Sequence, residues 1–124
     1  MARITRAEAY TRISRAIAAI DAGPTDADLR DAPILQNWMI DDEPVRGLHL
    51  IGCVSGHPTP PEGESIYTSA LLALDPAGRW ARCLNRWYRL EKAIPLYTEA
   101  NVRRMSELVD ERLKRIREQL PLLK

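Results

Sequence analysis

The amino-acid sequence predicts an α+β fold, in which an N-terminal helix and a long C-terminal helix pack on a small antiparallel meander of three to four strands. Near both ends of the chain, apolar residues recur every three or four positions, which is the period of one helix face. In the middle they alternate with a period of two, as along a strand. A length of 124 residues fits a single domain over 1–124.

The first predicted helix covers residues 5–22. Thr5 and Glu8 match a capping box, in which each side chain accepts a hydrogen bond from a backbone N–H at the helix start. Gly23-Pro24 ends the helix, because glycine accepts a left-handed cap and proline cannot continue the hydrogen-bond ladder. The apolar stripe of this helix consists of Tyr10, Ile13, Ile17 and Ile20.

A short helical turn is predicted over residues 26–31. Thr25 and Asp28 repeat the capping pattern at its start. Pro33 disfavours helical backbone in the preceding residue, so the turn ends before it.

The sheet is predicted over residues 34–90. Its strands are expected at 34–40, which carries Trp38, at 47–55, at 66–74 and at 79–89. The connections are an acidic loop at 41–44, a turn-rich segment at 56–63 and a compact hairpin connection at 75–78. Period-two alternation places on buried faces Leu48, Leu50 and Val54 in one strand, and Ile66, Thr68, Ala70, Leu72 and Leu74 in the next.

The second long helix is predicted over residues 98–120, with Thr98 or Asn101 as its cap and Pro121 beyond its end. Its apolar seam consists of Val102, Met105, Val109, Leu113, Ile116 and Leu120. The seam spans fewer than three heptads, so it favours packing on the protein's own core. A homodimer formed through this helix is the alternative.

The composition argues against several classes of protein. Cys53 and Cys83 are too few for a disulfide framework and lack CxxC spacing, which indicates free thiols in a reducing compartment. We find no signal-peptide pattern and no apolar run near the ~18 residues that cross a bilayer. The sequence therefore predicts a cytoplasmic protein without membrane contact, cofactor or metal.

Charge is segregated although the net charge is only +1. Residues 25–64 carry two arginines and eight acidic residues, whereas the segments on both sides are basic. An acidic middle and basic flanks can neutralise each other in the fold, or present surfaces of opposite sign to partners.

The densest aromatic and cationic segment is Arg79–Arg89, which holds two of the three tryptophans and four arginines. Read as one strand, it places Ala81, Cys83 and Trp87 beneath a helix. The opposite face then consists of Trp80, Arg82, Leu84, Arg86 and Tyr88, unless a bulge near Asn85 changes the second half of this assignment.

Three interpretations of this segment are open. It is a structural strand whose arginines pair with the acids of residues 41–43 and 62–64, a nucleic-acid surface, or a protein-binding hot spot, for which Trp, Tyr and Arg are the enriched anchors. Four arginines are few for binding that depends on neutralising phosphates.

His57 lies in a Gly-His-Pro bend and is a candidate general base, with Ser69 as a nucleophile. The nucleophile-elbow pattern G-x-S-x-G is absent, and a histidine that stabilises its own turn is the simpler interpretation. A metal site made of His49, His57 and Cys53 is not imposed by their spacing.

The segments Gly56-His57-Pro58, Thr68-Ser69 and Arg86–Leu90 resemble a group of short, functionally uncharacterised bacterial proteins. The resemblance covers about residues 23–91 and leaves the C-terminal helix outside it. It implies a common hairpin core and no known activity. Such proteins look like accessory genes of mobile elements, which implies a regulatory or host-interacting role.

Taken together, the sequence predicts a small non-enzymatic binding or regulatory protein that acts through protein–protein contact, such as a mobile-element-encoded regulator or inhibitor. The alternative is a nucleic-acid-binding protein that uses the Arg/Trp segment and the basic side of the C-terminal helix. The predicted partner-binding residues are Arg82, Arg86, Tyr88, Trp80, Arg103 and Arg104.

Overall fold

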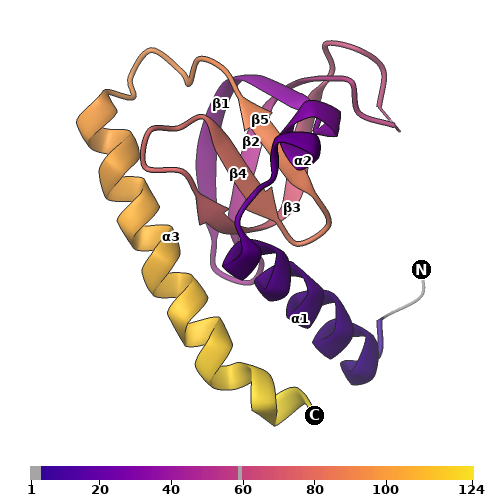
Figure 1. The fold of residues 1–124 in the computed structure, drawn as a ribbon. Helices are drawn as coiled ribbons and strands as arrows, with labels where there is room; N and C mark the ends of the chain where they lie inside the picture. Colours follow the sequence, from indigo (N-terminus) through magenta and orange to yellow (C-terminus); the bar gives the residue numbers. More distant parts are fainter. Residues whose placement is uncertain (1–3, 59) are drawn as a thin grey trace.

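A computed structural model describes residues 4–58 and 60–124 and shows a β-barrel flanked by helices (Figure 1). The α+β class is confirmed. In chain order the elements are α1 (Arg6–Ala22), α2 (Asp26–Asp31), β1 (Ile34–Glu43), β2 (Gly47–Ser55), β3 (Ser65–Leu74), β4 (Trp80–Cys83), β5 (Trp87–Leu90), α3 (Glu99–Gln119) and the short 3-10 helix η1 (Leu120–Leu123). The capping boxes predicted at Thr5 and Thr25 are both formed, and Thr98 caps α3 in the same way.

The five strands form a closed barrel in the order β1-β2-β3-β4-β5. Consecutive strands are antiparallel, and β5 closes the barrel by pairing in parallel with β1. In this seam Ile34 lies opposite Arg89 and Leu35 opposite Leu90. The predicted number of three to four strands is therefore too low. The fifth strand arises because the Arg/Trp segment folds back on itself.

Strands β4 and β5 form a tight hairpin where one strand was expected. The backbone N–H of Cys83 donates to the carbonyl of Arg86 at 2.9 Å, and Arg82 pairs with Trp87. The reversal inverts the predicted faces after the turn. Tyr88 consequently points into the barrel core instead of lying on an outer row with Arg82.

The acidic loop predicted at 41–44 is also wrong, because Asp41, Asp42 and Glu43 are the last residues of β1 and pair with β2. Strand pairing uses only backbone groups, so outward-facing acids do not prevent it. Asp42 forms an ion pair with Arg112 of α3 at 2.9 Å. Asp42 thus helps to hold α3, and Glu43 pairs with Arg46, so neither pairs with the Arg/Trp segment.

Strand β3 departs from simple alternation at two irregularities, one against β2 and one against β4. Leu71 and Leu74 lie inside the barrel. Leu72 lies outside and packs in a second cluster with residues of α1 and α3. The single buried face predicted for residues 66–74 is therefore divided between two cores.

The predicted seam of α3 faces these two cores. Val102 and Val109 pack on the barrel core, and Leu113 packs in the outer cluster with Ala16 and Ile17 of α1. Three of the six seam residues are thus buried within the chain, whereas Met105, Ile116 and Leu120 are half-buried. Within the described residues, no helix is long and apolar enough to cross a membrane.

Candidate functional site

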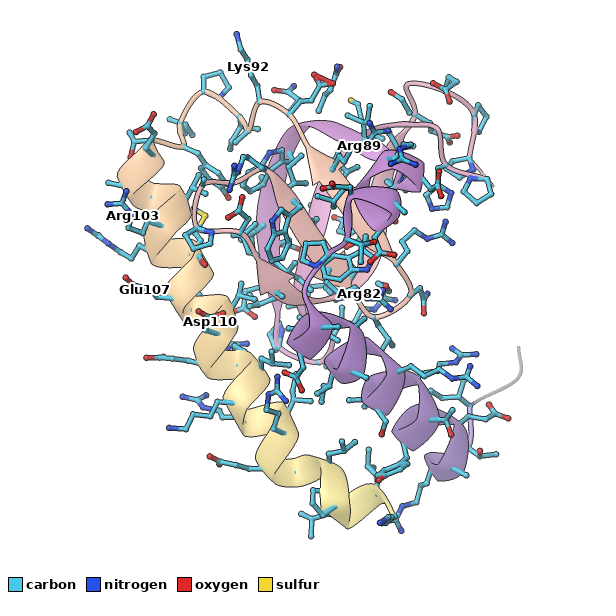
Figure 2. The ribbon with its side chains drawn as sticks, viewed as in Figure 1. Arg82, Arg89, Lys92, Arg103, Glu107 and Asp110 are labelled. Atoms are coloured by element: carbon cyan, nitrogen blue, oxygen red, sulfur yellow. The ribbon has the colours of Figure 1, made fainter. Side chains whose placement is uncertain are left out.

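The six predicted partner-binding residues fall into separate regions. Trp80 and Arg82 lie on the outer face of the β4–β5 hairpin, whereas Arg86 and Tyr88 lie at one end of the barrel. Arg103 and Arg104 are exposed on α3, and Figure 2 shows Arg103 well apart from Arg82. The structure therefore does not unite the six residues in one surface.

The outer Arg/Trp cluster consists of Trp80, Arg82, Trp87 and Arg89, and it attaches α2 to the barrel. The two tryptophan rings meet edge to face at 5.5 Å, and the guanidinium of Arg82 lies 5.4 Å from the centre of the Trp87 ring. Arg89 donates two hydrogen bonds, of 3.0 and 3.1 Å, to the carbonyl of Ala32 after α2. Burial lowers the pKa of Arg82. The side chains of this cluster thus pack on one another or hold the end of α2.

A pocket of about 470 Å³, which we call the Arg86 pocket, opens beside this cluster. Three segments that are distant in sequence build it: the loop after β2, the first half of β3, and the β4–β5 turn with the start of β5. Its lining residues are His57, Pro60, Glu64, Ile66, Tyr67, Thr68, Ser69, Asn85, Arg86 and Tyr88.

The floor of the Arg86 pocket is aromatic. The rings of His57 and Tyr88 stack at 6.2 Å with an angle of 30° between their planes. Burial raises the pKa of Tyr88 to about 12, so its hydroxyl stays protonated at neutral pH. Burial, and secondarily the charge of Arg86, lower the pKa of His57, which favours a neutral imidazole.

Two polar groups of this pocket, the guanidinium of Arg86 and the hydroxyl of Tyr88, are not paired by the described fold. Within the described residues, the guanidinium of Arg86 forms no ion pair or hydrogen bond, and the hydroxyl of Tyr88 forms no hydrogen bond. The hydroxyl of Ser69 accepts a hydrogen bond from the N–H of Asn85 at 3.2 Å, which leaves its own hydrogen free to donate. The pocket therefore presents several donors and one unpaired positive charge.

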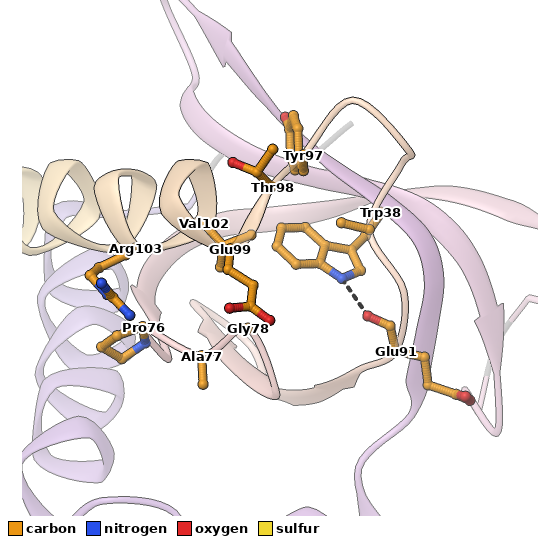
Figure 3. A pocket seen from close by; sticks show the side chains of 11 residues that line it. Trp38, Pro76, Ala77, Gly78, Glu91, Tyr97, Thr98, Glu99, Val102 and Arg103 are labelled. Atoms are coloured by element: carbon orange, nitrogen blue, oxygen red, sulfur yellow. Dashed lines mark hydrogen bonds between the residues drawn. The ribbon is translucent and has the colours of Figure 1, made fainter.

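The second pocket, which we call the Trp38 pocket, has a volume of about 340 Å³ and lies between the barrel and the start of α3 (Figure 3). Trp38 and Tyr97 pack edge to face at 5.8 Å. The indole N–H of Trp38 donates to the carbonyl of Glu91 at 2.9 Å, and the hydroxyl of Tyr97 accepts from the N–H of Ile40 at 3.0 Å. Glu99 and Arg103 line the same pocket.

The second histidine and the two cysteines are buried or half-buried. His49 is buried, and its Nδ1–H donates to the carbonyl of Thr68 at 3.0 Å. Burial raises the pKa of the Cys83 thiol to about 12, whereas Cys53 is half-buried. No group of three or more His, Cys, Asp or Glu side chains suited to a metal ion occurs in the described part of the chain.

Sequence reasoning identified Arg86 and Tyr88, although the predicted strand placed Tyr88 on the wrong face, and it overlooked Tyr67 and Asn85. A signal was nevertheless present. The segments that carry the resemblance are Gly56-His57-Pro58, Thr68-Ser69 and Arg86–Leu90, and each of them contributes to the Arg86 pocket. Their spacing in the sequence does not show that the three segments meet in one pocket.

A protein-family model, described as a family of unknown function (DUF6634), matches residues 1–111. The match includes α1 and the first half of α3, so it extends beyond the resemblance noted over 23–91 and takes in the start of the C-terminal helix. No curated protein and no solved structure is significantly similar to this chain.

Proposed function

We propose that this chain, which belongs to the family of unknown function DUF6634, is a small non-enzymatic binding protein that holds a protein partner in the Arg86 pocket. One observation carries the proposal: three distant segments build a pocket in which the guanidinium of Arg86 and the hydroxyl of Tyr88 form no hydrogen bond within the described residues. Polar groups that a fold does not pair at a half-buried position are available for a ligand. A cytoplasmic regulator or inhibitor would act in this way.

The charges around the pocket favour a protein over a nucleic acid. Glu64 lines the Arg86 pocket, and Glu62 lies two residues before it. On the other side of Arg86, Asp28 and Asp31 line a neighbouring depression. Nucleic-acid binding depends on neutralising many closely spaced phosphates, and these carboxylates would repel them. A single anchoring contact from a protein suits the surroundings better.

Two hydroxyl groups of the pocket, those of Tyr88 and Ser69, favour binding over catalysis. A general base or acid works best with a pKa near the working pH. The phenol of Tyr88, with a pKa of about 12, is far from that range. The hydroxyl of Ser69 is hydrogen-bonded to the β4–β5 turn, which is an ordinary structural use of a serine.

Affinity capture from the cells that make the protein tests the proposal, with the wild type, Arg86→Glu, and Arg12→Glu as a control with the same charge change on an exposed position of α1. Each capture is repeated after nuclease treatment. We expect a protein that is retained by the wild type and the control and lost with Arg86→Glu, with or without nuclease. The proposal would be contradicted if the Arg86→Glu variant retained the same protein as the wild type. Capture that disappears with nuclease would favour nucleic-acid binding instead.

A further inference from the structure

We infer that the Arg86 pocket recognises one carboxylate group of a peptide segment, next to an apolar side chain of the same segment. This inference rests on the proposed protein-binding function and adds the chemistry of the ligand. The donors would be the guanidinium of Arg86 and the hydroxyl groups of Tyr88 and Ser69.

The charge of the pocket matches a monoanion. Arg86 is the cation among the pocket's lining residues, and the nearby Arg82 and Arg89 are engaged with the Trp87 ring and the Ala32 carbonyl. The guanidinium fork fits both oxygens of a carboxylate in two parallel hydrogen bonds. A phosphate dianion would need further cations, and Glu64 in the lining opposes a second negative charge.

The donors converge from different elements. Arg86 comes from the turn before β5, Tyr88 from β5 itself, and Ser69 from β3. The body of Tyr88 is held in the barrel core at 3% exposure, so its hydroxyl is fixed in place before a ligand arrives. Preorganised donors lose little conformational entropy on binding, which favours recognition of a small group.

The size of the pocket indicates what accompanies the carboxylate. About 470 Å³ is far more than one carboxylate fills, and Pro60, Ile66 and Tyr67 supply apolar surface on its wall. Tyr67 is 60% exposed, which is unusual for a large ring without a binding partner. The remaining volume therefore suits an apolar side chain beside the acidic group.

The carboxylate can come from an acidic side chain or from the end of a chain, and short peptides separate these sources. We would titrate the protein with N-acetyl-Leu-Glu-amide, its Gln analogue, and N-acetyl-leucine with a free carboxylate, following the Arg86 Nε–H and the His57 ring by NMR. Inorganic phosphate is the fourth probe. We expect the Glu peptide or the free carboxylate to bind at least about tenfold more tightly than the Gln analogue, the usual effect of a charge-assisted hydrogen bond.

Variants test the assignment of donors. Arg86→Gln should weaken carboxylate binding by about tenfold or more and Tyr88→Phe by a smaller factor of about three to ten, whereas the control Arg12→Gln, at an exposed position of α1, should not weaken it. The spectra of each variant show whether it is folded. The inference would be overturned if neither the Glu peptide nor N-acetyl-leucine bound more tightly than the Gln analogue, or if phosphate bound more tightly than both.

The two proposals can fail separately. If capture of a protein depends on Arg86 but no carboxylate probe binds, the ligand chemistry is wrong and the binding function stands. If the probes bind as expected but the Arg86→Glu variant captures the same proteins as the wild type, the pocket recognises a carboxylate and the protein-binding function is wrong.

Discussion

The two ends of the barrel use similar residues in different ways. At the end where β3 stops, the Trp38 pocket contains Trp, Tyr, Glu and Arg side chains, and the chain itself pairs the indole N–H and the tyrosine hydroxyl. At the end where β3 starts, the Arg86 pocket contains Tyr, His, Glu and Arg side chains, and within the described residues neither the phenol hydroxyl nor the guanidinium has a hydrogen-bond partner. Residue types alone do not distinguish the two ends, whereas the pairing of the aromatic polar groups does, because the Trp38 indole and the Tyr97 hydroxyl are hydrogen-bonded within the chain and the Tyr88 hydroxyl has no partner among the described residues.

We call the end of the barrel with the Trp38 pocket the closed end and the end with the Arg86 pocket the open end. The largest expected effect is a loss of stability at the closed end. Trp38 is 1% exposed and sits in the barrel core, so Trp38→Ala removes a large buried side chain and an indole hydrogen bond. We expect the free energy of unfolding to fall by about 3–5 kcal/mol in urea denaturation. Tyr67→Ala is the control at the open end, where an exposed ring should cost less than about 0.5 kcal/mol. Similar losses for both variants would remove the contrast between the two ends.

Alkaline pH should act on the open end. Burial raises the pKa of Cys83 to about 12 from an ordinary value near 9, and its thiol lies beside Thr68, which lines the Arg86 pocket. The unfolded thiol ionises first, so the stability present at neutral pH is lost as the pH rises from about 9 toward 12. We expect a loss on the order of 2–3 kcal/mol between pH 8 and pH 11, at about 1.4 kcal/mol for each pKa unit.

Substitutions identify the groups responsible for this dependence of the unfolding free energy on pH. Cys83→Ala should flatten the dependence of unfolding free energy on pH in this range, and Tyr88→Phe should flatten it above pH 10, since burial also raises the Tyr88 pKa. An unchanged slope in Cys83→Ala would show that the thiol is not the group responsible.

Two glycines allow a further comparison of the closed end with the open end. Gly78 and Gly56 both have positive φ, of 71° and 72°, so alanine at either position costs about 1–2 kcal/mol of backbone strain. A Cβ atom at Gly78 would also lie 3.0 Å from Cγ1 of Val102 in α3, whereas a Cβ atom at Gly56 meets nothing within 4 Å. Gly78→Ala should therefore destabilise the protein by about 1 kcal/mol more than Gly56→Ala in thermal unfolding. Equal effects would mean that α3 yields easily at the closed end.

The smallest effect is expected where binding is proposed. Arg86→Ala and Tyr88→Phe remove groups that form no hydrogen bond within the described residues, so each should change the unfolding free energy by less than about 0.5 kcal/mol. Chemical denaturation measures this. A loss above 1 kcal/mol for Arg86→Ala would assign the guanidinium to the fold and not to a ligand.

Local signals in the sequence predicted the helices well. The capping boxes at Thr5 and Thr25 depend on residues three positions apart, so the sequence contains all the information that they need. The apolar seam of α3 was also predictable, because apolar residues recur along one face of a helix whatever element that face packs against.

The barrel and its pocket depended on information that local patterns lack. Nothing within Arg79–Arg89 shows that the chain reverses after Cys83, and this reversal turns Tyr88 inward. The irregularities of β3 are set by its two neighbouring strands, so alternation misassigned Leu71. The Arg86 pocket joins three segments that become neighbours only when the barrel is closed.

The parallel seam between β1 and β5 has a consequence for the order of folding. It joins distant positions, as the 3.1 Å hydrogen bond between Gln36 and Glu91 shows across 55 residues, whereas the β4–β5 hairpin pairs residues only a few positions apart. Closing a long loop costs more chain entropy than closing a hairpin, so we expect the hairpins to form first and the seam last. During synthesis, the barrel cannot close until the residues of β5 have left the ribosome.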